Sequence, residues 1–423
     1  MGRRMAKLEA DVAFFGMCLR KKYVDQLFFK QLAASGIPWK DKKKVIRPYR
    51  SGTGQRVQDI RSACDRLWNL LLGKNFRRHG DYHLWSAVMR THFDRAWYVK
   101  RRHALDSFKL WNSRGAEDKP GVQDGPTFLR AAGLVSRLED LGHPVRDYYD
   151  VKEEDNSNVT STKAVESDCV GKSSKKVKNA VAKVLSSGSL SLNIGGDHTM
   201  SIGTVIAHAM SVDSNISLLW VDAHGDINTP LSTSSGHIHG MPVAFLLREM
   251  EPFLRKPEGM EWIQPCVRKD NFAYIALRNI DPYERYFMDK LGITLYSMED
   301  VDRIGITEVI RLVLRQINPG GTRSVHVSFD IDSIDKLIVP STGTPEIGGL
   351  SMREALVIAE EVHRSGQLRV LDLAEVNPRL GTAEDADRTV NCGVDIITSF
   401  FGRERRGNLP VILDPSVIKK KED

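Results

Sequence analysis

The segment Asp222-Ala223-His224-Gly225-Asp226 decides the fold of this 423-residue chain. It follows directly on the apolar run Ile216-Ser217-Leu218-Leu219-Trp220-Val221, which is typical of a buried strand. In an extended chain, side chains at positions i, i+2 and i+4 point to the same side. The segment therefore places two carboxylates and one imidazole together at the point where a buried strand ends.

Two further clusters of the same residue types follow strand-like segments. Gly195-Gly196-Asp197-His198 follows the run at 189–194, and Asp330-Ile331-Asp332 ends the run at 324–330. Taken singly, each Asp fits a helix cap or a turn, and each His fits a buried, hydrogen-bonded core residue. Three clusters of metal-ligand residues at three strand ends favour one shared site instead.

From about residue 121 onward, strand-like and helix-like segments alternate. We predict strands at 189–194, 216–222, 272–277, 324–330 and 369–375, and helices near 200–211, 307–317 and 351–364. A helical stretch begins at Gly125-Pro126 and closes near Gly142, and the polar, Ser- and Lys-rich segment 155–176 is typical of a loop. Such alternation predicts an α/β fold with a parallel sheet, in which ligands bind at the carboxyl ends of the strands.

The composition is that of a globular protein from a reducing compartment. Hydrophobic residues make up 41% and charged residues 27%. No apolar run approaches the roughly 20 residues of a membrane span, and we expect no secretory signal. The five scattered cysteines argue against a disulfide framework and against a thiolate zinc site. We expect a cytoplasmic protein, with the mitochondrion as the alternative because Met1 to Arg20 partly resembles a transit segment.

The net charge of +7 belongs to the leading part of the chain alone. Residues 1–100 hold 22 Lys and Arg against 8 Asp and Glu, a balance of +14, so the remainder carries −7. We predict a basic N-terminal extension of uncertain order at 1–110, a catalytic domain at 111–415 and a charged tail at 416–423. Binding of nucleic acid or a membrane surface by 1–110 is the alternative, but no binding motif supports it.

The three clusters supply six candidate metal ligands: His198, Asp222, His224, Asp226, Asp330 and Asp332. Their four carboxylates carry −4, which two divalent cations would balance, and unpaired buried charge is very costly. Oxygen-rich ligation with two imidazoles suits Mn(II), with Co(II) or Fe(II) as alternatives. Two metal ions lower the pKa of a shared water and supply hydroxide near neutral pH. We therefore predict hydrolysis of a carbon–nitrogen or phosphoryl bond.

The motifs of this sequence resemble those of the ureohydrolases, and among them those of the arginases most closely. The matching stretches are Gly195–His198, Trp220–Pro230, Ser235–Val243, Ser328–Asp332, Thr342–Pro345 and Glu375–Pro378. The resemblance runs from about Gly121 to about Asn408. It implies a three-layer α/β/α sandwich with a mainly parallel sheet, two manganese ions per subunit, and hydrolysis of L-arginine to L-ornithine and urea.

The resemblance also implies how the site is divided. One manganese would be held by His198, Asp222, Asp226 and Asp330, and the other by Asp222, His224, Asp330 and Asp332. Asp226 would take the proton of the hydroxide nucleophile. His239 would act as a proton shuttle, a role that the ordinary histidine pKa of about 6.5 suits. Glu375 would orient the substrate guanidinium.

Substrate choice depends on other positions. By resemblance, Asn228 and Ser235 contact the α-carboxylate, Asp281 with Glu284 contacts the α-amino group, and Thr344 lies near the guanidino end. Agmatine has no carboxylate, so the Asn228 and Ser235 pair favours arginase. The alternatives are an agmatinase or another guanidino-acid amidinohydrolase, and a non-catalytic arginase-like protein.

The sequence departs from the family pattern ahead of Gly121. Where the family has an apolar strand, Leu105 to Trp111 matches poorly, so either Ser107 to Trp111 replaces that strand or the sheet lacks it. Lys336 stands where proline is usual, and His237 where asparagine is common. The family's common assembly is a homotrimer, and Arg353, Glu354 and Arg405 resemble its intersubunit ion pairs, although taken alone they are surface charges.

Overall fold

The computed structural model describes residues 105–110, 119–151 and 163–408, all within one compact unit, His103–Asp423. These residues form an eight-stranded sheet in the order β2-β1-β3-β8-β7-β4-β5-β6, and every pairing in it is parallel. Apart from 105–110, the predicted extension at 1–110 lies outside the described residues, as does the tail at 416–423. The predicted α/β class is confirmed.

The strands are β1 (Leu105–Leu110), β2 (Val145–Val151), β3 (Leu190–Gly195), β4 (Ile216–Val221), β5 (Phe272–Leu277), β6 (Thr294–Ser297), β7 (Ser324–Asp330) and β8 (Leu368–Ala374). The α-helices are α6 (Gly125–Ala131), α7 (Leu134–Asp140), α8 (Lys163–Ser186), α9 (Met200–Ser211), α10 (Pro242–Leu246), α11 (Pro282–Leu291), α12 (Met298–Ile304), α13 (Ile306–Ile317), α14 (Met352–Ser365) and α15 (Ala383–Phe400). Short 3-10 helices are η2 (Val122–Asp124), η3 (Ile238–Gly240), η4 (Arg248–Phe253), η5 (Lys269–Asn271) and η6 (Ile331–Ser333). No described helix combines the length and the apolar character that a membrane crossing requires.

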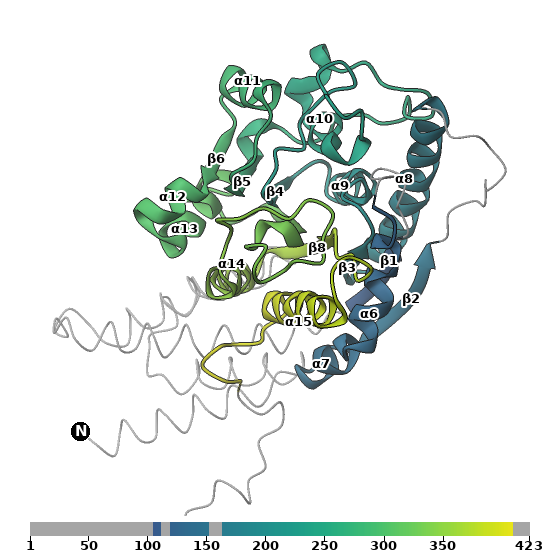
Figure 1. Ribbon diagram of the computed structural model, residues 1–423. Helices are drawn as coiled ribbons and strands as arrows, with labels where there is room; N and C mark the ends of the chain where they lie inside the picture. The colour runs from purple at the N-terminus through teal and green to yellow at the C-terminus, as the bar shows by residue number, and fades with distance from the viewer. Residues whose placement is uncertain (1–104, 111–118, 152–162, 409–423) are drawn as a thin grey trace, which may run out of the picture. The chain divides into compact units, whose positions relative to one another are not determined.

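Helices cover both faces of the sheet, which gives the three layers expected from the resemblance (Figure 1). Helices α6, α7, α13, α14 and α15 pack on one face, and α8, α9 and α10 pack on the other. Alternate residues of one strand serve the two layers. In β4, Leu219 and Val221 join the first layer, whereas Leu218 and Trp220 join the second.

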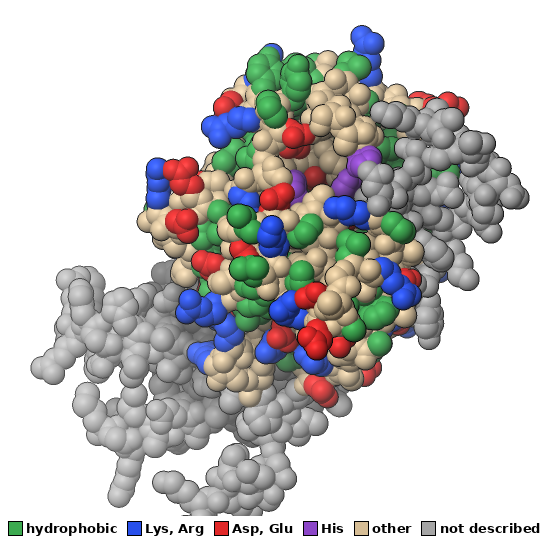
Figure 2. Space-filling model, in the orientation of Figure 1, with side chains coloured by type: hydrophobic (Ala, Val, Ile, Leu, Met, Phe, Trp, Pro, Cys, Tyr) green, Lys and Arg blue, Asp and Glu red, His purple; other side chains and the backbone are tan. Residues whose placement is uncertain are grey.

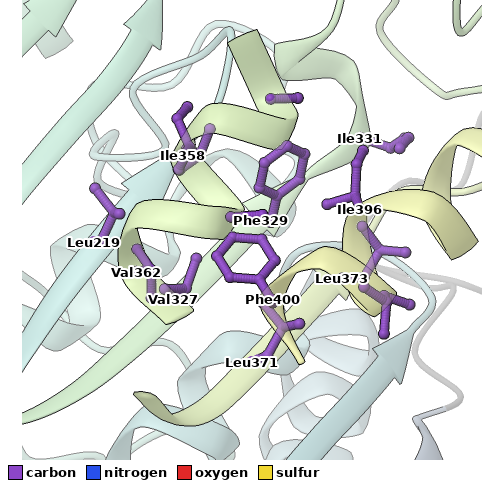
Figure 3. Close-up of a cluster of buried hydrophobic side chains, with 14 of the residues drawn as sticks. Leu219, Val327, Phe329, Ile331, Ile358, Val362, Leu371, Leu373, Ile396 and Phe400 are labelled. Carbon is purple, nitrogen blue, oxygen red and sulfur yellow. The ribbon is translucent and has the colours of Figure 1, made fainter. Parts of the chain in front are cut away.

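The larger core lies between the sheet and α14 and α15 (Figure 3). The rings of Phe329 in β7 and Phe400 in α15 meet edge to face, with centroids 6.1 Å apart. Strands buried on both faces have near-continuous apolar sequences. For that reason the central strands β3, β4, β5, β7 and β8 were predictable, and each lies within a residue or two of its predicted bounds.

The strands without a sequence signal are β2 and β6, which form the two edges of the sheet. An edge strand has one neighbour and needs less apolar sequence, and β2 reads VRDYYDV. The doubtful first strand is present as β1, which pairs with both β2 and β3. The segment ahead of residue 111 therefore does supply the strand, and the sheet begins before the boundary that we predict for the catalytic domain.

The predicted loop at 155–176 is wrong over 163–176, which belong to helix α8. The frequent Ser and Lys residues of this segment obscured a buried stripe that includes Val170, Val177 and Val181 at helical spacing. The predicted helical stretch from Gly125 to Gly142 is two helices, because Gly133 takes a left-handed φ of 83° between α6 and α7.

Helices α8 and α9 approach closely at Gly203. A Cβ at this position would lie 2.4 Å from the carbonyl oxygen of Ser174 and 2.7 Å from Cγ1 of Val177. Gly203→Ala gains about 1 kcal/mol of helix propensity but forces the two helices apart, an overpacking that costs about 1–3 kcal/mol. Because the closest contact is with a backbone carbonyl, we expect a cost of about 2–3 kcal/mol, so that the free energy of unfolding, measured by urea denaturation, falls by about 1–2 kcal/mol.

The matched control is Gly320→Ala, where the nearest atom would lie 3.6 Å from the new Cβ. We expect little change there. Unaltered stability of the Gly203→Ala protein would contradict the close packing of α8 on α9.

Candidate active site

The six predicted ligands lie at the carboxyl ends of neighbouring strands of the sheet. His198 follows β3, Asp222 to Asp226 follow β4, and Asp330 ends β7. In the sheet order these strands lie close together, with β8 and Glu375 between β3 and β7. Histidine and acidic side chains gather around a hollow on the face of the molecule shown in Figure 2. The residues predicted as ligands are thus brought into one place.

The imidazole of His198 lies at the centre of the first ligand group. Its Nδ1 lies 3.1 Å from Oδ2 of Asp222, 3.2 Å from Oδ2 of Asp226 and 3.1 Å from Oδ2 of Asp330. All four residues are buried. Three carboxylate oxygens and one imidazole nitrogen therefore face a common point.

A second group forms around His224 and shares Asp222 with the first. Nδ1 of His224 lies 3.5 Å from Oδ1 of Asp222 and 3.2 Å from Oδ2 of Asp332. In each of the groups His198–Asp222–Asp330 and Asp222–His224–Asp332, the candidate ligand atoms lie within 4.8 Å of one another. Because Asp222 belongs to both groups, its carboxylate would help to hold a cation in each of them.

The orientation of His198 supports a metal ion at this point. Its Nε2 hydrogen-bonds Oγ of Ser328 at 2.9 Å, and its ring stacks on Trp220 with centroids 4.1 Å apart. Within the described part of the chain, its buried Nδ1 has no hydrogen-bond partner, although three carboxylates surround it. With the proton on Nε2, Nδ1 presents a lone pair, as a metal ligand must.

The carboxylates are held in place by donors from their own strand ends. Nε1 of Trp220 donates to Oδ2 of Asp222 at 2.9 Å, and the backbone N–H of His224 donates to Oδ1 of Asp222 at 2.7 Å. The backbone N–H of Asp332 donates to Oδ1 of Asp330 at 2.8 Å. Oxygen ligands with two imidazoles and no thiolate suit Mn(II).

The pKa values show how strongly this site requires positive charge. Burial by itself lowers the pKa of His224, but the carboxylates of Asp332 and Asp222 outweigh burial and raise this pKa to about 12. Burial and the charge of Asp222 raise the pKa of Asp226 to about 6. Burial, together with Asp332 and Asp222, raises the pKa of Asp330 well above its usual range. Protons or metal cations must neutralise the cluster, and the two compete for the same lone pairs.

Two site residues other than glycine have left-handed backbone conformations. The φ of Asp226 is 50° and that of Glu375 is 64°. Such residues cost of order 1–3 kcal/mol and cluster at functional sites. Backbone bonds hold both, since Asp226 accepts from Val243 N at 2.9 Å and Glu375 donates its N–H to Gly196 O at 2.9 Å.

His239 and Glu375 lie beside the first ligand group. Nδ1 of His239 donates to Oε1 of Glu375 at 3.3 Å, and the same oxygen accepts the backbone N–H of His198 at 3.0 Å. Burial lowers the pKa of His239, but the hydrogen bond to Glu375 and the nearby carboxylates raise it to about 9. The side chain of His239 remains 18% exposed and that of Glu375 only 3%.

The residues predicted to select the substrate occupy different positions around the site. Nδ2 of Asn228 donates to Oδ2 of Asp281 at 2.9 Å. This bond links the residue predicted to contact the α-carboxylate of the substrate to the residue predicted to contact its α-amino group. Ser235 is exposed, and its Oγ accepts the N–H of His237 at 3.2 Å. Thr344 donates to Oδ2 of Asp332 at 2.9 Å and so contacts a candidate metal ligand directly.

Glu284 is buried, with only 4% of its surface exposed. Its two carboxylate oxygens accept the backbone N–H groups of Ile227, at 3.1 Å, and Asp281, at 3.0 Å. Burial raises its pKa to about 7. This side chain joins the loop after β4 to the start of α11, so it supports Asp281 from behind.

Sequence reasoning assigned no role to Ser328 or Trp220, although both stand inside the quoted motifs. A signal was present, because each lies two residues before a candidate ligand: Ser328 before Asp330 in β7, and Trp220 before Asp222, which directly follows β4. Residues i and i+2 share one face of an extended chain. That both contact His198 depends on how β3, β4 and β7 align.

Comparisons with known proteins agree with this geometry. A profile of the Arginase family matches residues 111–402. Arginase-1 from Bos taurus and from Homo sapiens are each 43% identical over 294 residues, which is 69% of this chain and 91% of theirs. The structure of an arginase from Bacillus subtilis superposes with a TM-score of 0.63 at 30% identity, over 71% of this chain and 99% of that one.

The fold and the comparisons together define the class as hydrolases that act on guanidino carbon–nitrogen bonds. The chain belongs to the arginase family.

Removal of the hydroxyl that orients His198 should weaken metal binding. In a Ser328→Ala protein, Nε2 of His198 loses its partner, and loss of such a supporting contact typically costs about 10–100-fold in metal affinity. Isothermal titration of the metal-free protein with Mn(II) measures this loss. The control is Ser324→Ala on the same face of β7, where the hydroxyl bonds His208 and no candidate ligand. Equal Mn(II) affinities of the two variants would contradict the assigned role of Ser328.

Proposed function

We propose that this protein is a manganese-dependent arginase that hydrolyses L-arginine to L-ornithine and urea. The observation that carries the proposal is the pair of ligand groups sharing Asp222, with the Glu375–His239 pair beside them. His198, Asp222, Asp226 and Asp330 would hold one Mn(II), and Asp222, His224, Asp330 and Asp332 the other. When bound, the two ions lower the pKa of a shared water and so supply hydroxide near neutral pH.

Glu375 orients the guanidinium group of the substrate. Its Oε1 is engaged by His239 and by the backbone of His198, so we assign Oε2 to the guanidinium N–H groups. Oε2 lies close to Gly343, because a Cβ added to Gly343 would lie 3.4 Å from Oε2. The segment next to Thr344 therefore borders this end of the pocket. A charge-assisted bond from a planar guanidinium to a carboxylate fixes direction as well as position.

Protons move through Asp226 and His239. Asp226 has a pKa raised to about 6 by burial and by Asp222, so it can accept the proton left when the nucleophile adds to the guanidinium carbon. His239 has a raised pKa of about 9 and is protonated at neutral pH. It can therefore donate a proton to the departing ornithine amine while Glu375 holds its Nδ1.

The amino-acid end of the substrate is assigned to the loop after β4 and the start of α11. Asn228 and Ser235 would donate to the α-carboxylate, and Asp281 would accept from the α-amino group. A hydrogen bond between Asn228 and Asp281 already sets their spacing. A substrate without the carboxylate leaves an N–H of the buried Asn228 without a partner, which costs about 1–3 kcal/mol, whereas the exposed Ser235 can bond water instead.

Urea release from L-arginine and from agmatine distinguishes the family activities. We expect manganese-loaded full-length protein to favour L-arginine in kcat/KM by at least about tenfold, the effect of one unsatisfied polar group. Faster urea release from agmatine would instead identify an agmatinase. Binding of two Mn(II) without release of urea from either compound, or from another guanidino acid, would identify a non-catalytic relative.

The Asp226→Asn variant tests whether Asp226 takes part in the reaction rather than only in the folding of the protein. Asn tolerates the left-handed backbone at this position but cannot accept a proton, so we expect a loss of about 10²–10⁴-fold in kcat with an unchanged fold by circular dichroism. Asp213→Asn is the matched control, because Asp213 has the same φ of 50° in the turn before β4. Retained turnover in the Asp226→Asn protein would refute the role of Asp226.

We propose a homotrimer in the cytoplasm, with the mitochondrion as the alternative compartment. Of the predicted trimer residues, Arg353 is exposed. Glu354 caps the start of α14, and Arg405 makes a bidentate bond to Glu360 of its own chain at 3.0 and 3.1 Å. An ion pair from Arg405 to another subunit would therefore have to form in addition to its bond with Glu360.

A further inference from the structure

The side chain of Arg278 lies within hydrogen-bonding distance of six backbone carbonyl oxygens, more than any site residue discussed above. The residue follows β5, and its guanidinium donates to carbonyl oxygens from three parts of the chain. The acceptors are Asp332 at 2.7 Å, Ser333 at 3.1 Å, Ile334 at 3.2 Å, Glu346 at 3.0 Å, Ile347 at 3.1 Å and Ala276 at 3.4 Å. Six carbonyl dipoles thus converge on one planar cation with five N–H groups, and the two N–H groups of Nη2 are shared among three of the carbonyls.

The first three acceptors belong to the turn that carries the metal ligand Asp332. This turn is η6, and the carbonyl of Asp332 makes the shortest bond to Arg278, at 2.7 Å. The carboxylate of the same residue forms part of the Asp222–His224–Asp332 group. Arg278 therefore fixes the backbone from which this carboxylate projects.

The next two acceptors belong to the segment after Thr344. This segment runs beside the η6 turn, because the N–H of Lys336 donates to Glu346 at 3.1 Å and the N–H of Leu350 donates to Ser333 at 3.0 Å. Thr344 in turn donates to Oδ2 of Asp332 at 2.9 Å. Arg278 and Thr344 thus hold the ligand from its backbone and from its side chain.

There is little room for another arrangement around the guanidinium. A Cβ on Gly349 would lie 2.6 Å from Nη2 of Arg278 and 2.7 Å from the carbonyl carbon of Ile334. A lysine ammonium has three donors and no planar fork, so it can satisfy at most half of these six carbonyls. The remaining carbonyls would lose their partners and the turn would loosen.

We propose that Arg278 is a positioning residue for Asp332, and that it sets the affinity of the Mn(II) ion assigned to Asp222, His224, Asp330 and Asp332. This proposal rests on the manganese pair of the proposed function. The group around His198 has its own supports in Ser328 and Trp220, and it depends on the η6 turn only through the N–H of Asp332, which donates to Asp330. Loss of the guanidinium should therefore weaken the ion held by Asp332 more than the ion beside His198.

The test measures metal binding rather than turnover. Metal-free wild-type protein, Arg278→Lys and Arg278→Gln are titrated with Mn(II) by calorimetry, and electron paramagnetic resonance distinguishes a spin-coupled manganese pair from a single ion. The control is Arg285→Lys, since Arg285 is an exposed arginine of α11 that bonds Asp289. Hydrogen exchange of residues 331–350 reports whether the turn has loosened.

We expect both Arg278 variants to bind the ion held by Asp332 about 10–100-fold more weakly and to lose clearly less affinity for the ion beside His198. The coupled signal should return at excess Mn(II), with faster exchange confined to 331–350. Two ions bound as tightly as in wild type, or both weakened by the same factor, would overturn the proposal. Failure of both variants to fold would place Arg278 in the fold alone and would overturn it as well.

The failure of the proposed function gives a different result. In that case the wild-type protein itself would bind fewer than two Mn(II), or would bind two and release no urea. The selective loss of one ion in the Arg278 variants is judged only against a wild type that binds two.

Discussion

The mutual repulsion of buried carboxylates is the constraint on which this structure depends. Asp222, Asp226, Asp330 and Asp332 meet at the end of the sheet, where burial and their neighbours raise the pKa values of Asp226 and Asp330. Only cations can hold such a cluster together, and the imidazoles of His198 and His224 can accept protons or donate lone pairs to a metal. The raised pKa values of both histidines express that requirement. A site of this kind requires positive charge, from protons or from metal ions, by electrostatics before any chemistry is considered.

The fold meets this constraint through rigidity around the cluster. Parallel strands bring their carboxyl ends to one edge, and helices on both faces exclude water from their flanks. At that edge, backbone N–H groups and the indole of Trp220 hold the carboxylates, and Ser328 holds His198. Asp226 and Glu375 take left-handed conformations that the surrounding hydrogen bonds maintain. These supports keep the ligands in place at some cost in local strain.

Hydrogen bonds to the backbone also hold the segments that carry the residues assigned to the substrate. Glu284 joins the loop of Asp226 and Ile227 to Asp281, and Arg278 joins the turn of Asp332 to the segment after Thr344. The candidate metal ligands and the residues assigned to the substrate are therefore held by supports of the same kind.

The sequence by itself determined the central strands, the α/β class and the identity of the candidate ligands. Doubly buried strands must be apolar throughout, and ligands must be carboxylates or imidazoles, so both leave a local signal. Only the tertiary structure decided the edge strands β2 and β6, the extent of α8, and the roles of Ser328, Glu284 and Arg278. Edge strands and solvated helix faces tolerate polar residues, and a supporting side chain is defined by partners 50 or more residues away. Such partnerships exist only once the chain has folded.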